Sequence, residues 1–304
     1  MTYKPESFDE LVRDAVRAVS AAIEDGNRRL EVEFPPLPGS VDQYKGASDA
    51  YIDANAQLAL SAAQLLADAG KKIRILVPDA AELERALEMY QYTLSVVDNV
   101  TMGHTREGKP GVFGSISTLL GGNGSDDQLA DAQDTDIFIV INHSTIELAS
   151  IEEHVEQFGQ GKVVVLWNLE LDTLRADLGL LGFPSKDLHY RFLCQFMPAF
   201  YLRQRDYAKT VAVAPFVINY SGALFREYPG PWQVMLKQDD GTYACIAEEK
   251  GRYNLGEAKE ELMAAMGLNT EAPGSTMAFL RRGYKRSTWW EDGADKEESA
   301  AWRS

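Results

Sequence analysis

The hydrophobic pattern of this chain changes period several times, and each change marks an expected element. Residues 7–26 open with a capping box and repeat apolar residues at helical spacing until Gly26. Residues 30–34 alternate between apolar and acidic, whereas residues 53–69 are rich in Ala and Leu almost all round. The first segment therefore predicts an amphipathic helix, the second a strand, and the third a helix that is buried on more than one side.

Short, mainly apolar runs then alternate with segments that begin at a helix cap. Strands are expected at residues 72–77, 96–102, 137–141 and 163–167, with helices after the first and third of them. Continuously apolar strands that alternate with helices are typical of a parallel sheet covered on both faces. The sequence therefore predicts an α/β fold with a mostly parallel, Rossmann-like sheet and helices on both faces.

The pattern changes after residue 188, where strand-like segments follow one another without intervening helices. These segments are residues 189–201, 211–220, 232–236 and 243–248, and Asp239-Asp240-Gly241 is typical of a hairpin turn. We predict a C-terminal antiparallel β-meander that extends the parallel sheet. Trp232 follows a proline-rich turn, and we expect it to anchor the core of this meander.

These patterns predict a single α/β domain followed by a tail. The domain is expected to span residues 1–268, with a parallel core at about 28–185, the meander at about 188–250 and a closing helix at 255–266. Residues 269–304 are rich in Gly, Pro and charge, which predicts a mobile C-terminal tail.

Charge and composition exclude several classes of function. The formal net charge is -16, from 46 acidic and 30 basic residues, and such a field repels phosphate backbones, so we predict no nucleic-acid binding. No apolar run reaches the length of a membrane span, which leaves peripheral membrane association at most. The four histidines lack the spacing of metal ligands, and we predict neither a metal nor another cofactor.

Polar residues follow the expected parallel strands, where ligands bind in many open α/β sheets. Asp79, Asn142, His143 and Asn168 are therefore candidates for a ligand crevice. The alternative is structural, with Asp79 capping a helix and the asparagines satisfying turns. Nearby, residues 103–110 are one residue short of a phosphate-binding loop, because Pro110 stands where Ser or Thr would hold magnesium. We expect a surface loop there.

Two further groups of residues have both a functional and a structural interpretation. Glu31 and Glu33 alternate with apolar residues, which predicts the solvent side of an edge strand rather than a pair of catalytic carboxylates. Arg203, Arg226 and Tyr228 lie among other aromatic residues of the expected meander. They could form a docking surface for a partner, or they could stack and pair within the meander.

The tail holds a basic and aromatic island in an otherwise acidic chain. Arg281, Arg282, Trp289 and Trp290 belong to it. Such an arm can touch a membrane interface or clasp another subunit. The alternative is a tail that is disordered or docked on its own domain.

Several motifs together resemble a known family. They are residues 75–79 (ILVPD), residues 164–168 (VVLWN) and above all residues 225–234 (FREYPGPWQV). They are similar to the uncharacterised-domain proteins of chloroplasts and cyanobacteria that include the low-photosystem-II-accumulation assembly factors. The same domain resembles the C-terminal extension of plastid adenylate kinases.

The resemblance implies a non-enzymatic assembly or stability factor for a thylakoid photosynthetic complex, with photosystem II as the first candidate. It implies a protein of the chloroplast stroma, either free or peripheral to the thylakoid membrane. Its partners would be subunits of that complex or other assembly factors, and no catalytic residues can be carried over. The alternative, from fold alone, is a small-molecule or nucleotide-binding α/β enzyme acting at the carboxyl ends of the parallel strands.

Overall fold

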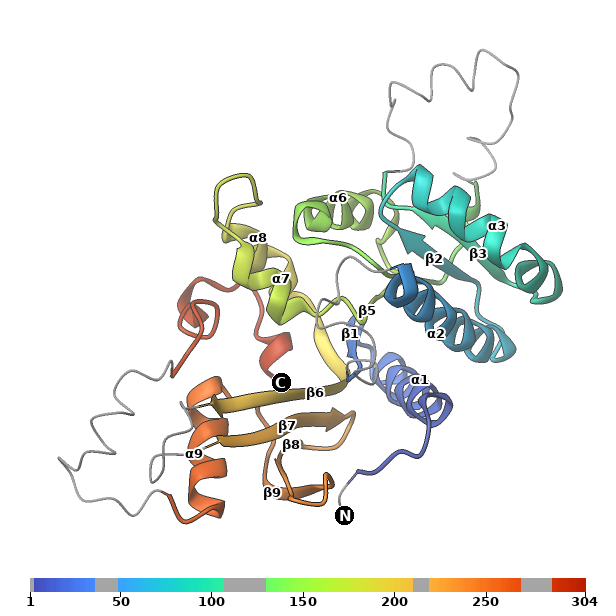
Figure 1. The fold of residues 1–304 in the computed structure, drawn as a ribbon. Helices are drawn as coiled ribbons and strands as arrows, with labels where there is room; N and C mark the ends of the chain where they lie inside the picture. The colour runs from blue at the N-terminus through green and yellow to red at the C-terminus, as the bar shows by residue number, and fades with distance from the viewer. Residues whose placement is uncertain (1–2, 36–48, 107–129, 210–218, 269–285) are drawn as a thin grey trace.

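A computed structural model describes residues 3–35, 49–106, 130–209, 219–268 and 286–304. In these ranges the chain forms one nine-stranded sheet with the order β3-β2-β4-β5-β1-β6-β7-β8-β9 (Figure 1). The strands are β1 (Arg29–Glu33), β2 (Ile73–Val77), β3 (Val100–His104), β4 (Ile137–Val140), β5 (Val163–Trp167), β6 (Met197–Lys209), β7 (Asn219–Glu227), β8 (Trp232–Lys237) and β9 (Tyr243–Glu249).

The sheet has a parallel and an antiparallel part that share β6. Strands β3, β2, β4, β5, β1 and β6 are parallel to their neighbours in that order. From β6 to β9 each pairing is antiparallel, so these four strands form a meander. The prediction of a mostly parallel α/β sheet with a C-terminal antiparallel meander is confirmed.

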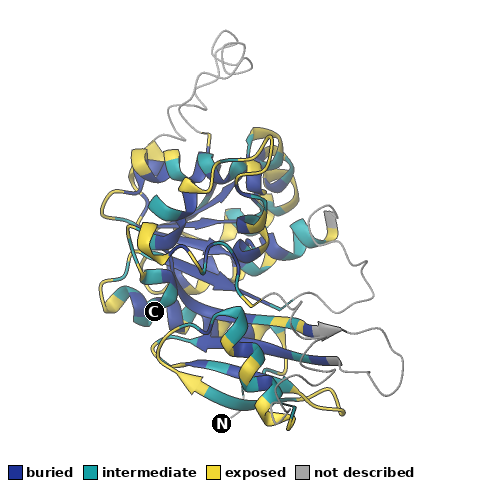
Figure 2. Cartoon of the chain, turned by 90° about the vertical axis from the view of Figure 1, so that its left-hand side faces the viewer, coloured by how far each residue is buried: buried dark blue, intermediate teal, exposed yellow. Residues whose placement is uncertain are grey.

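Helices cover both faces of the sheet and form two main cores with it. The buried strands between the helices are dark blue in Figure 2. Helices α1, α2 and α3 pack on one face, against Val32, Ile75 and Ile139 among others. Helices α6, α7 and α8 pack on the other, and α9 covers the meander. Their bounds are α1 (Phe8–Glu24), α2 (Asp49–Asp68), α3 (Ala80–Val96), α6 (Leu148–Phe158), α7 (Leu171–Asp177), α8 (Asp187–Arg191) and α9 (Leu255–Ala265).

Two predicted strands are corrected at their beginnings. Helix α3 continues to Val96, and Asn99 reverses the chain with a φ of 62° before β3 starts at Val100. Residues 189–195, which were expected to be extended, are helical instead, and β6 starts at Met197. Leu188 and Phe192 are one helical turn apart, and both are buried in the second core, so tertiary packing decides the local structure.

The expectation of a mobile tail is corrected for residues 286–304, which fold back onto the domain. Trp290 and Trp302 are buried in a small cluster with Cys194. Burial of these large aromatic side chains offsets part of the conformational entropy that ordering the segment costs. Residues 269–285, with the candidates Arg281 and Arg282, lie outside the described residues, as does the glycine-rich segment 107–124.

Candidate functional site

The carboxyl ends of β2 and β4 meet where the strand order reverses, which is the usual ligand position in such sheets. Asp79 lies directly after β2 and caps helix α3. Its Oδ1 accepts hydrogen bonds from the backbone amides of Ala81 and Glu82, both at 3.0 Å. The carboxylate is therefore used to begin a helix, as the structural alternative predicts.

Three asparagines, which we call the asparagine bracket, tie α2 to the ends of β4 and β5. They are Asn55, Asn142 and Asn168. Asn55 Nδ2 donates to Asn142 Oδ1 at 2.9 Å, and Asn168 Nδ2 donates to Asn55 Oδ1 at 3.3 Å. The remaining amide groups of the two strand-end residues bond to backbone: Asn142 Nδ2 donates to the Ile52 carbonyl, and Asn168 Oδ1 accepts from the Phe34 amide.

The bracket also explains the backbone at both strand ends. Asn142 and Asn168 have φ values of 60° and 51°, in the left-handed region that asparagine tolerates better than most residues. Asn55 was missed from the sequence. Its only signal was that it is a polar residue on the buried face of an Ala- and Leu-rich helix.

His143 is buried beside the bracket in a chain of neutral hydrogen bonds. Its Nδ1 donates to the Ile141 carbonyl at 2.7 Å, and its Nε2 lies 3.0 Å from Thr105 Oγ1. Thr105 Oγ1 is also 2.9 Å from the Ser150 hydroxyl. Burial lowers the pKa of His143 to about 4, so the ring is neutral at neutral pH.

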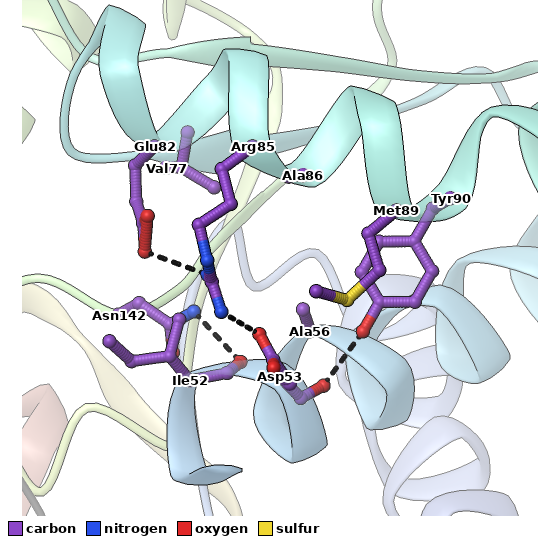
Figure 3. Close-up of a pocket in the computed structure, with 10 residues that line it drawn as sticks. All are labelled: Ile52, Asp53, Ala56, Val77, Glu82, Arg85, Ala86, Met89, Tyr90 and Asn142. Carbon is purple, nitrogen blue, oxygen red and sulfur yellow. Dashed lines mark hydrogen bonds and ion pairs between the residues drawn. The ribbon is translucent and has the colours of Figure 1, made fainter. Parts of the chain in front are cut away.

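A small pocket opens beside these residues, between α2 and α3 (Figure 3). Its enclosed space holds little more than one water molecule, far below the range of typical ligand sites. Arg85 points into it, but its guanidinium pairs with Asp53 and, at 3.3 Å, with Glu82. Tyr90 donates to the Asp53 carbonyl at 2.9 Å. The crevice expected at this edge is therefore narrow, and its charges are already paired.

A second polar region, the charge cluster, lies on the other face of the sheet between β1, β6 and α7. Its members are Glu31, Glu33, Asp172, Arg175, Tyr201, Arg203, Arg205 and Arg252. The predicted solvent exposure of Glu31 and Glu33 is wrong, because the two residues are only 1% and 2% exposed. Strand β1 lies inside the sheet between β5 and β6, and α7 covers this face.

Asp172 is the centre of the charge cluster. It accepts hydrogen bonds from Arg175 at 2.9 Å, Arg205 at 2.5 Å, Arg252 at 3.0 Å and the Tyr201 hydroxyl at 3.1 Å. Burial acts to raise the pKa of this carboxyl, but the surrounding guanidinium groups outweigh it and hold the pKa well below its usual value. The network joins α7 to β6 and to the segment after β9.

The two glutamates of β1 complete the cluster from the sheet side. Glu33 accepts from the Glu170 amide at 3.0 Å and pairs with Arg203 at 3.4 Å. Glu31 lies 3.9 Å from Arg175, and burial raises the pKa of its carboxyl. Four arginines thus face three acidic side chains, and two of these arginines, Arg203 and Arg205, keep part of their side chains in solvent.

The candidate partner residues of the meander are largely turned inward. Arg226 is buried, donates to the Pro198 carbonyl at 2.7 Å, and lies over the rings of Tyr228 and Trp232. Tyr228 is partly exposed, and its hydroxyl donates to Asp25 at 2.7 Å. In the C-terminal segment Trp290 is buried and Trp289 is partly buried. Arg203 belongs to the charge cluster.

The family with the description "Domain of unknown function (DUF1995)" matches residues 5–260. The chain belongs to this family. No curated protein matches it.

In the described part of the chain, no group of three or more His, Cys, Asp or Glu side chains is placed to hold a metal ion, and no helix is long and apolar enough to cross a bilayer.

The DUF1995 region contains the asparagine bracket, the pocket and the charge cluster, whereas residues 286–304 follow it. This C-terminal segment packs over the charge cluster. Arg252 donates its backbone amide to the Arg303 carbonyl at 2.8 Å, and the Trp232 indole donates to the Ser304 carbonyl at 3.0 Å. The Trp302 ring lies 5.1 Å from the guanidinium carbon of Arg175. The segment thereby shields these arginines from solvent.

Proposed function

We propose that this DUF1995 chain is a non-enzymatic assembly or stability factor for a photosynthetic complex of the thylakoid, with photosystem II first among them. It would act from the chloroplast stroma, free or at the membrane surface, on complex subunits or other assembly factors. The likeness of residues 225–234 to the low-photosystem-II-accumulation factors supports this role, compartment and partner class.

One structural observation favours binding over catalysis. The polar side chains at the carboxyl ends of the parallel strands are committed to bonds within the protein: Asp79 to a helix cap, the asparagine bracket to itself and the backbone, and His143 to Ile141 and Thr105. A catalytic crevice needs such groups to be directed at a substrate. Here they brace the sheet edge.

A small-ligand function is the second candidate, and the pocket of Figure 3 is the observation that favours it. Its position at the reversal of strand order suits a nucleotide or another small metabolite. A thermal-shift screen with nucleotides and plastid metabolites tests this candidate. A ligand that raises the melting temperature of the native chain but not of Arg85→Ala would favour it over the scaffold role.

Affinity purification from detergent-solubilised thylakoids tests the proposed role. The tagged chain is expected to recover photosystem subunits in amounts that survive a salt wash. An unrelated acidic protein with the same tag and a similar net charge is the control, because a net charge of -16 attracts basic proteins non-specifically. Recovery of no photosystem subunit, or equal recovery by the control, would refute the proposal.

A further inference from the structure

The loop between α7 and α8 carries an apolar tip, residues 179–184, which has no polar side chain. Its sequence is Gly-Leu-Leu-Gly-Phe-Pro. Leu181 is fully exposed, Leu180 is 54% exposed and Phe183 is 37% exposed. In Figure 1 this loop projects away from the body of the protein above α8. Three adjacent large apolar side chains therefore face solvent on a protrusion.

The shape of the apolar tip is fixed by its own backbone. Gly179 donates to the Pro184 carbonyl at 2.8 Å, and Phe183 donates to the Leu180 carbonyl at 3.1 Å. Gly179 and Gly182 have φ values of +84° and +87°, which other residues rarely adopt. The loop thus pairs several of its backbone donors internally while it presents hydrocarbon outward, which lowers the cost of contact with an apolar medium.

The residues around the apolar tip are also of the kinds found at a membrane surface. Ile146 is 60% exposed, and its neighbour Thr145 hydrogen-bonds to Asp177 at the start of the loop. At the other end, the exposed Lys186 places its ammonium 4.8 Å from the ring centroid of Trp289. A lysine and a partly buried tryptophan at the base of an apolar protrusion are typical of the membrane–water interface.

We infer that the apolar tip is a lipid-contacting element that inserts Leu180, Leu181 and Phe183 into the interfacial layer of a bilayer. The residues that carry most of the energy in protein interfaces are Trp, Tyr and Arg, within a polar rim, whereas the tip offers only Leu and Phe side chains with no polar group. The headgroups should be electrically neutral, because anionic lipid repels a protein with a net charge of -16.

Flotation of the 304-residue chain with lipid vesicles tests this inference. The native chain is expected to float with phosphatidylcholine vesicles and to bind less well when phosphatidylglycerol is added. Leu181→Ser should weaken the partition about tenfold, because a leucine side chain loses its transfer into the bilayer. Leu87→Ser, the same change at an exposed leucine of α3, is the matched control and should bind like the native chain.

A second variant reports on insertion directly. Leu181→Trp should show fluorescence that is quenched by vesicles of lipids brominated on the acyl chains, more strongly than that of the native chain. Melting temperatures of all variants establish that each is folded. The inference is overturned if the native chain does not float, if Leu181→Ser floats equally well, or if the new tryptophan is not quenched.

The inference goes beyond the proposed function and does not rest on it. The vesicles contain no protein, so failure of flotation leaves the recovery of photosystem subunits as a separate question. If purified thylakoid proteins bind the chain through Leu181 while protein-free vesicles do not, the tip docks on protein and the lipid inference is wrong.

Discussion

Asp172 shows at the scale of one residue how this fold holds charge in its interior. Arg175, Arg205 and Arg252 all donate to it, and the side chains of Arg175 and Arg252 are 0% and 5% exposed. Removal of one partner from a buried ion network leaves the others uncompensated. The Asp172 carboxylate therefore stabilises the fold mainly because it neutralises the charges of these arginines.

We expect Asp172→Asn to lower the free energy of unfolding by about 3 to 5 kcal/mol, since it leaves buried guanidinium groups without their counter-charge. Urea denaturation at neutral pH measures this loss. Asp134→Asn is the matched control, because Asp134 pairs with Lys72 on the exposed surface, and it should cost about 1 kcal/mol or less. Equal losses for the two variants would contradict the central place of Asp172.

His154 predicts a dependence of stability on pH. It is buried between Phe138 and Phe158, and burial lowers its pKa to about 3. The pKa of a histidine in the unfolded chain is about 6.5. Between pH 6.5 and pH 3 the unfolded chain therefore binds a proton at His154 that the folded protein does not bind. The stability that neutral His154 allows is present above pH 6.5 and is lost as the pH falls toward 3.

His154→Leu should remove this part of the pH dependence. Between pH 6 and pH 4 the free energy of unfolding should fall less steeply than in the native chain, by up to about 1.4 kcal/mol per pH unit. Urea denaturation across this range measures both slopes. An unchanged slope would mean that His154 does not remain neutral in the folded protein.

At the scale of elements, the sequence predicted correctly those helices and strands whose positions depend on nearby residues alone. Helix α1 and strand β2 match their predicted positions, because a capping box and a short apolar run have few other interpretations. The position of β1 inside the sheet, between β5 and β6, could not be predicted from its own residues. The arginines whose charges act on Glu31 and Glu33 come from α7, β6 and the segment after β9, which are more than 130 residues away in the chain.

The meander depends on Trp232, whose side chain is fully buried at the start of β8. Trp232→Ala should lower the free energy of unfolding by about 3 to 5 kcal/mol, the usual cost of removing a buried aromatic side chain. Trp232→Phe keeps much of the packing and loses the indole donor to Ser304, so it should cost less. Thermal and urea unfolding compare the three proteins, and an unchanged melting temperature in Trp232→Ala would refute its anchoring role.

At the scale of the whole molecule, the sequence predicted correctly that the polar residues after the parallel strands lie together. It did not predict that they bond to one another and to the backbone. Asn142 and Asn168 do come together at one edge of the sheet, as parallel strands require. Their common partner Asn55 lies on a helix far away in the chain, so only the tertiary structure reveals a closed bracket. The same holds for Arg226, a candidate for docking that the fold directs onto Tyr228 and Trp232.

The surface that is exposed to partners differs from the one predicted from the sequence, which consisted of residues of the meander and the tail. The interior takes Arg226 and Trp290, and the C-terminal segment covers the charge cluster. The apolar tip between α7 and α8 carries exposed hydrocarbon that no motif had marked. A docking role therefore calls for tests at this loop as well as at the partly exposed Tyr228.

The amount of assembled photosystem II in a line that lacks this protein is the most direct test of the proposed role. We expect that amount to fall, and to be restored equally by the native chain and by Arg85→Ala, which removes the only basic side chain among the described residues that line the pocket of Figure 3. Normal photosystem II in the null line would contradict the role. Rescue by the native chain but not by a folded Arg85→Ala variant would show instead that the pocket, and the ligand it binds, carries the function.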